Sequence, residues 1–173
     1  MKRLSLFVCL AVVGFASVAT ARGNRTETVF RSDGIYTAPT TAALADVATN
    51  PVSDVKWKLK EGRVTLSYDL PAELVGETNT EIAMSGFFDP ATGLYALSGA
   101  LGTATCAATV QADKTTAMHC AELMPRLQVD LVATEAALAA RIADPTEAAR
   151  RLEVAVAFAH EPIGFVDFTL RTR

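Results

Sequence analysis

The chain has 173 residues, and 16 Lys and Arg against 19 Asp and Glu give it a formal net charge of −3. This length suits a single domain of ordinary size, and the acidic balance argues against nucleic acid as the main partner. Half of the residues are hydrophobic, which argues against a chain that is disordered throughout.

The first 21 residues have the pattern of a secretory signal peptide. Lys2 and Arg3 precede an apolar run over residues 4–18, and Ala19-Thr20-Ala21 is a small-x-small cleavage site. The apolar run is shorter than the roughly 20 residues of a membrane-spanning helix, and no later stretch replaces it. We therefore predict cleavage after Ala21, no membrane span, and export to the periplasm or the extracellular space.

Residues 22–53 are polar, rich in threonine and alanine, and carry only weak structural signals. We expect a small hairpin over Thr28–Thr37 that turns at Ser32-Asp33-Gly34, and a short helix from Thr41 to Ala48. We interpret this stretch as a weakly structured N-terminal segment. It leads into a single β-rich domain over residues 54–173.

The first hairpin of this domain is predicted by alternation and by turn chemistry. Apolar residues alternate with lysines up to Lys60, and they alternate with polar residues again from Arg63 to Leu70. Glu61-Gly62 between the two runs is a two-residue loop with glycine second, which is typical of a hairpin. The resulting register places Trp57 opposite Leu66 and gathers every apolar side chain on one face.

A second hairpin is predicted from Thr80–Asp89 and Leu94–Leu101, in a register that places Phe88 opposite Tyr95 and Gly86 opposite Leu97. The glycines that follow have two interpretations. Gly99 and Gly102 mark either a turn or a kink within one long strand that reaches residue 110.

The third hairpin carries the only two cysteines that remain after removal of the signal peptide. Two alternating runs flank a polar turn, and a register that places Cys106 opposite Cys120 also places Ala104 opposite Glu122. Because an even number of thiols in an oxidising compartment favours pairing, we predict a Cys106–Cys120 disulfide. Two free buried thiols are the alternative.

One helical segment is predicted near residues 134–151. Thr134 is the expected cap of an alanine-rich helix, and Asp144-Pro145-Thr146-Glu147 restarts the helix with an N-cap, a proline at its first position and a glutamate at its third. From Leu152 to Ala159 large apolar residues alternate with Glu and Ala, which favours a strand paired with residues 165–171. A helix that continues through Phe158 is the alternative.

These elements predict a mainly β (α+β) fold. Successive hairpins must bury their apolar faces, so we expect an antiparallel β-barrel or a two-sheet sandwich with the helical segment near residues 134–151.

No catalytic, metal or cofactor motif is present in the sequence. The two histidines, His119 and His160, belong to no zinc-type spacing, and no nucleophile elbow or phosphate-binding loop occurs. We predict no metal, no cofactor and no catalytic residue. The enzyme alternative is a small exported hydrolase that uses carboxylates, such as Asp130 with Asp167, or His160 with Glu161.

The most definite cluster of charge is basic. Lys56, Lys58, Lys60 and Arg63 project together from the first hairpin and form a candidate face for an anionic ligand. A soluble strand face, or lysines that protect an edge from pairing, would explain the same pattern. We expect a non-catalytic exported domain that binds a small ligand in a barrel mouth or a component of the cell envelope. A structural or inhibitor-like protein that makes contact through a loop such as Asp89–Gly93 is the other alternative.

Overall fold

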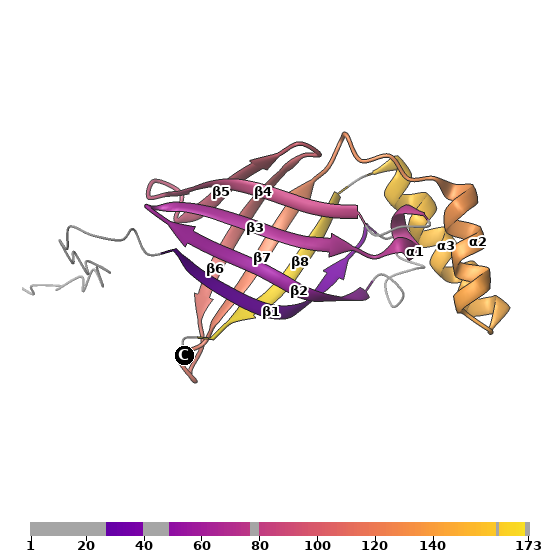
Figure 1. The fold of residues 1–173 in the computed structure, drawn as a ribbon, viewed down its shortest axis with the longest axis horizontal. Coiled ribbons are helices and arrows are strands. Elements are labelled where there is room, and N and C mark those ends of the chain that lie inside the picture. Colours follow the sequence, from indigo (N-terminus) through magenta and orange to yellow (C-terminus); the bar gives the residue numbers. More distant parts are fainter. Residues whose placement is uncertain (1–26, 40–48, 77–79, 162, 172–173) are drawn as a thin grey trace, which may run out of the picture.

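The computed structural model describes residues 27–39, 49–76, 80–161 and 163–171, and within them eight strands form a closed antiparallel barrel (Figure 1). Each strand pairs with the next, and the last pairs with the first. The strands are β1 Thr28–Thr37, β2 Thr49–Lys60, β3 Arg63–Leu70, β4 Thr80–Asp89, β5 Leu94–Gly99, β6 Thr103–Val110, β7 Thr116–Leu123 and β8 Ile163–Leu170. Of the two expected architectures, the barrel is confirmed.

The two ends of the barrel differ. Helix α1 (Ala72–Val75) joins β3 to β4, while α2 (Leu131–Arg141) and α3 (Pro145–His160) lie between β7 and β8, so these helices gather at one end, here called the helical end (Figure 1). The opposite end, here called the hairpin end, carries the turns between β2 and β3, β4 and β5, and β6 and β7. Among the described residues, no helix has the length and apolarity to cross a membrane.

The three predicted hairpins are present in their predicted registers. Trp57 pairs with Leu66, Phe88 with Tyr95, and Cys106 with Cys120. Glu61 and Gly62 both have positive φ, of 53° and 78°, as a type I′ hairpin turn requires. The chain turns between Gly99 and Gly102, where the Gly99 N–H donates to the Gly102 carbonyl over 2.8 Å. The kinked single strand is therefore wrong.

The expected hairpin over Thr28–Thr37 is wrong. Residues 28–37 form one strand, β1, with an irregularity between Ser32 and Gly34 instead of a hairpin turn. The strand has a partner on each side, β2 along its length and β8 at Gly34–Thr37, so turn-forming residues are accommodated as a bulge. β2 already begins at Thr49. The expected signal peptide and the expected helix from Thr41 to Ala48 lie outside the described residues.

The expected strand over residues 152–159 is wrong, because α3 continues to His160. Asp144 caps this helix as predicted: its carboxylate accepts hydrogen bonds from the backbone N–H groups of Thr146 and Glu147. Val154 and Phe158, four residues apart, are buried together on one helix face. This burial favours the helix over a strand, so β8 pairs with β7 and β1 instead. Helix α2 is capped by Asp130, not by Thr134.

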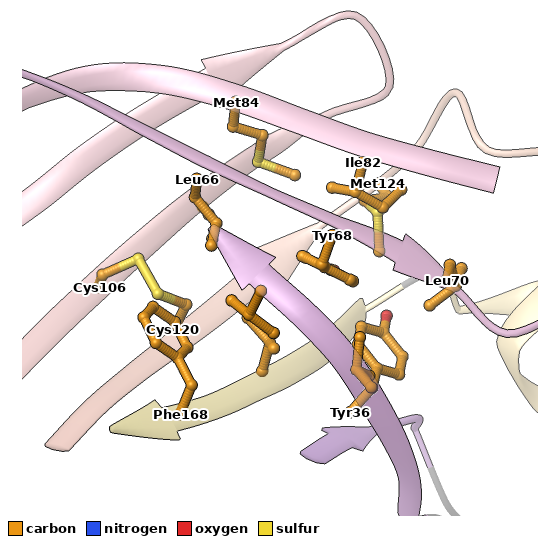
Figure 2. Packing of buried hydrophobic residues seen from close by; sticks show 14 of the residues in the cluster. Tyr36, Leu66, Tyr68, Leu70, Ile82, Met84, Cys106, Cys120, Met124 and Phe168 are labelled. Atoms are coloured by element: carbon orange, nitrogen blue, oxygen red, sulfur yellow. A yellow bond between two sulfur atoms is a disulfide. The ribbon is translucent and has the colours of Figure 1, made fainter. Parts of the chain in front are cut away.

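The barrel interior is filled by large side chains. Trp57 lies edge-on to Tyr95 and against Phe168, with ring centroids 5.2 and 5.9 Å apart. The Cys106–Cys120 disulfide, with its Cα atoms 4.0 Å apart, lies beside Phe168 in Figure 2 and joins β6 to β7. Burial of each large side chain contributes roughly 1.5–3 kcal/mol, and a disulfide that closes a loop of this size contributes about 3 kcal/mol. Apolar packing is therefore the larger stabilising contribution.

Candidate binding surface and a buried acid

The four predicted basic residues lie together on the outer wall of the barrel. The β2–β3 register pairs Lys60 with Arg63, Lys58 with Thr65 and Lys56 with Ser67. Because successive side chains of a strand alternate between the two faces, these cations point away from the interior that Trp57 and Leu66 occupy. The turn chemistry of Glu61-Gly62 thus positions the whole basic face.

Nearby acids compensate part of this face. Asp54 forms ion pairs with Lys56 at 2.9 Å and with Arg31 at 2.6 Å. Hydrogen bonds from these two cations lower the pKa of its carboxyl group. Lys58 lies 3.7 Å from Glu27. Within the described part of the chain, neither Lys60 nor Arg63 forms an ion pair, and Arg63 donates a hydrogen bond of 2.5 Å to Ser85. The two cations without an ion pair in these ranges, Lys60 and Arg63, therefore lie nearest the hairpin end.

A hollow of about 460 Å³ adjoins this charge. Its lining combines basic, acidic and aromatic side chains, namely Glu27, Lys58, Lys60, Glu61, Arg63, Thr65 and Phe87. Phe87 pairs with Arg63 in the β3–β4 register, and 58% of its surface is exposed. Phe87 could not be predicted as part of this face, because its position beside Arg63 depends on pairing between strands that no tight turn connects.

Apolar side chains also reach solvent at the rim of the hairpin end. Phe88 is 48% exposed and packs on Tyr95 at 5.1 Å, and Tyr95 in turn packs on Trp57. Leu59 is 41% exposed. A continuous row of aromatic rings therefore leads from the core to the surface at the end of the barrel that carries Lys60 and Arg63. Trp57 and the cystine fill the interior below this rim.

The acids and histidines of the enzyme alternative do not converge. Asp130 accepts hydrogen bonds from the N–H groups of Val132 and Ala133 as the cap of α2, so it does not pair with Asp167. His160 is the last residue of α3, and Glu161 is its C-cap, so both lie at the end of a helix.

Asp167 instead meets a histidine that the sequence did not connect to it. His119 Nδ1 lies 2.7 Å from Asp167 Oδ1, and the imidazole ring stacks on Phe165. Both residues line an open hollow of about 510 Å³ on the outer wall, with Thr109, Gln111 and Thr169. The pair depends on the β7–β8 register, which could not be predicted while residues 152–159 were expected to pair with β8.

A buried carboxyl group lies under the helical end. Glu122 on β7 is 1% exposed and accepts a hydrogen bond from the hydroxyl group of Tyr68. Burial raises the pKa of Glu122 to about 7, against an opposing effect of this hydrogen bond. The other carboxylate oxygen, Oε1, and the hydroxyl group of Tyr36 have no hydrogen-bond partner among the described residues. The sequence register placed Glu122 opposite Ala104, as observed, but gave no sign of its tyrosine neighbours.

Neither a metal site nor a known relative adds to this geometry. In the described ranges, no group of three or more His, Cys, Asp and Glu side chains is arranged to hold a metal ion. Comparison with protein-family models, curated proteins and solved structures finds no match to this chain.

Proposed function

We propose that this protein is an exported, non-catalytic binding domain that docks its hairpin end on an anionic lipid surface of the cell envelope. The observation that supports this most is the row formed by Lys60, Arg63 and Phe87 on three adjacent strand segments. It combines two cations that form no ion pair among the described residues with a largely exposed aromatic ring at one end of the barrel.

Such a row has the chemistry of a membrane interface. Each Lys or Arg near an anionic membrane surface contributes about 1 kcal/mol of attraction, and exposed aromatic rings add apolar contact at the headgroup level. The whole chain is acidic, with a net charge of −3, so general electrostatic attraction does not provide this affinity. A local basic patch on an acidic protein favours one docking orientation, with the helical end directed away from the surface.

Two of the other hypotheses, a ligand in the barrel mouth and a hydrolase, have weaker support. A ligand in the barrel mouth would compete with Trp57, Phe168 and the cystine, which are at most 5% exposed. The His119–Asp167 pair is half exposed on the outer wall, where water weakens the electrostatic effects on which hydrolysis depends. The geometry therefore favours surface docking.

Co-sedimentation with vesicles tests the proposal. We expect binding to vesicles that contain phosphatidylglycerol and none to vesicles of phosphatidylcholine alone. The double variant Lys60→Ser/Arg63→Ser should bind about 30-fold more weakly, since two cations at about 1 kcal/mol each remove about 2 kcal/mol. The difference should shrink as salt concentration rises.

The matched control changes the same charge at the other end. Arg141→Ser/Arg150→Ser removes two exposed helix cations, one paired with Glu73 and the other with Glu147. This variant should bind vesicles as the unmodified protein does. Equal loss in both double variants, or no binding to anionic vesicles by the unmodified protein, would exclude the proposed docking surface.

A further inference from the structure

The interior of the barrel at the helical end contains an acid that the proposed function does not use. Glu122 is buried, and within the part of the chain that the structure describes neither its Oε1 nor the neighbouring Tyr36 hydroxyl group has a hydrogen-bond partner. Carboxyl groups are rarely buried without a cation or a full set of hydrogen bonds, because the ionised form is costly to desolvate. A neutral carboxyl group avoids most of that cost.

The described elements around Glu122 provide no positive charge to hold the ionised form. Ala104 on β6 and Gly164 on β8 flank it in the sheet, and the titratable groups that face it are Tyr68 of β3 and Tyr36 of β1. Both tyrosines have pKa values raised well above the usual range, mainly by burial.

The charged groups of the helices are engaged elsewhere. Arg151 of α3 binds Glu147 on its own helix and Asn50 at the start of β2, at 2.9 Å in both cases. Arg141 of α2 binds Glu73 of α1 at 2.7 Å. Among the described residues, the hydrogen bond that the Glu122 carboxylate accepts therefore comes from the Tyr68 hydroxyl group and not from a cation.

A chain of ring contacts connects this acid to the cap. Tyr36 lies 6.1 Å from Tyr68 and meets Phe158 of α3 edge-on, also at 6.1 Å between ring centroids. The Tyr36 hydroxyl group lies against the backbone of Gly164, where an added Cβ would come within 1.9 Å. Figure 2 shows Tyr36 and Tyr68 together near Leu70, toward the helical end. Phe158 of α3 therefore packs on Tyr36, one of the two tyrosines that face Glu122.

The strands are the less mobile partner in this contact. Ladder hydrogen bonds and the cystine fix the barrel wall. Residues 161–162 connect the end of α3 covalently to β8. In the described part of the molecule, the other attachments of α3 to the strands are side chains such as Phe158 and Arg151, and no backbone hydrogen bond joins α3 to a strand. If water must reach the carboxylate, release of α3 costs less than separation of two strands.

We propose that Glu122 is a proton-operated latch for the helical cap: in its neutral form it allows α3 to close over the barrel, and in its ionised form it favours an open state in which α3 lifts and water solvates the carboxylate. This is a conformational device at the opposite end of the barrel from the proposed docking surface, and it does not depend on that function.

Native-state hydrogen exchange measures the latch directly. The pKa of Glu122 is about 7 in the closed state and should return to its ordinary value of about 4.3 once solvated. Opening therefore releases a proton between these values, so the opening constant for amides of residues 154–158 should rise about tenfold per pH unit from pH 5 to pH 7 and level off above. Exchange rates are first corrected for the intrinsic effect of pH.

Two variants separate the latch from other acids. Glu122→Gln should remove the pH dependence and keep α3 in its low-pH, closed behaviour. Glu153→Gln makes the same change on the exposed face of α3 and should leave the slope intact. Persistence of the slope in Glu122→Gln would contradict the proposal.

Two further measurements give an answer even if Glu122→Gln does not fold. In the unmodified protein, amides of residues 154–158 should have a larger opening constant than amides of β3, residues 64–68, since lifting α3 leaves the strands paired; equal opening constants in the two segments would mean global unfolding and would overturn the latch. Tyr68→Phe removes the hydrogen bond that lowers the pKa of Glu122, so the levelling point should move to higher pH. A shift to lower pH, or no shift, would contradict the proposed role of Glu122.

Discussion

The two ends of the barrel differ in which kind of side chain is buried and which kind is exposed. At the helical end, polar groups of Glu122, Tyr36 and Tyr68 lie inside, under a cover of helices. At the hairpin end, the apolar rings of Phe87 and Phe88 lie outside, with no cover among the described residues. The buried polar groups make the conformation of the helical end sensitive to pH. The exposed apolar groups make the hairpin end suited to bind another surface. Substitutions at the two ends should therefore differ in what they change.

The largest expected effect on stability is at the helical end, in Gly164→Ala. The added Cβ would lie 1.9 Å from the Tyr36 hydroxyl oxygen and 2.4 Å from its Cζ, so the ring must leave its contacts with Phe158 and Tyr68. We expect a loss of about 3 kcal/mol in the free energy of unfolding, the upper end of the usual range for overpacking. Urea denaturation monitored by circular dichroism measures it.

A double-mutant cycle identifies the cause of this loss. Tyr36→Leu removes the hydroxyl group and the ring carbon that carries it, so Gly164→Ala should cost much less in that background than in the unmodified protein. Additive costs would mean that the tyrosine is not what excludes a side chain at position 164.

A smaller effect is expected from the cap of α3. Asp144→Ala removes the acceptor for the backbone N–H of Thr146, at 2.8 Å, and should lower the free energy of unfolding by about 1 kcal/mol. Asp144→Asn keeps an acceptor oxygen and should retain most of this stability. Equal losses in the two variants would show that the hydrogen bond is not responsible. Thermal unfolding of both variants provides the comparison.

The smallest effect on stability is expected at the hairpin end, in Phe87→Ser. The side chain is 58% exposed, so the free energy of unfolding should change by no more than about 0.5 kcal/mol. Binding to vesicles with phosphatidylglycerol should nevertheless fall about tenfold, at low and at high salt, because the lost contact is apolar. Val132→Ser, at a site on α2 that is 79% exposed, is the control and should bind normally.

The sequence predicted those parts of the fold that short-range chemistry determines. Glu61-Gly62 and the alternation around it were sufficient for the β2–β3 register, and the paired cysteines marked the β6–β7 register. Residues 152–158 were ambiguous, because Val154 and Phe158 fit both a period of two and a spacing of four. Burial of these two side chains together favours the helix. This burial depends on the closed barrel, so it could not be predicted from the local sequence.

The same division applies to the candidate sites. Lys56, Lys58, Lys60 and Arg63 belong to one hairpin, so alternation alone placed them on one face. Alternation also placed Glu122 on the same face of β7 as Cys120, two residues before it. The tyrosines that face Glu122 of β7 come from β1 and β3, which are distant from β7 in the sequence. Only closure of the sheet into a barrel brings these side chains together.

That closure has a kinetic consequence. Gly34 of β1 pairs with Phe168 of β8, so the final seam joins residues from nearly opposite ends of the chain, while β2 to β7 can associate through neighbours in sequence. Contacts of such high sequence separation slow folding, because the entropy of a long loop is lost before the contact forms. During synthesis from the N-terminus, one edge of β1 stays unpaired until β8 has been made. Completion of the barrel, and with it burial of Glu122, is therefore expected to be the last step of folding.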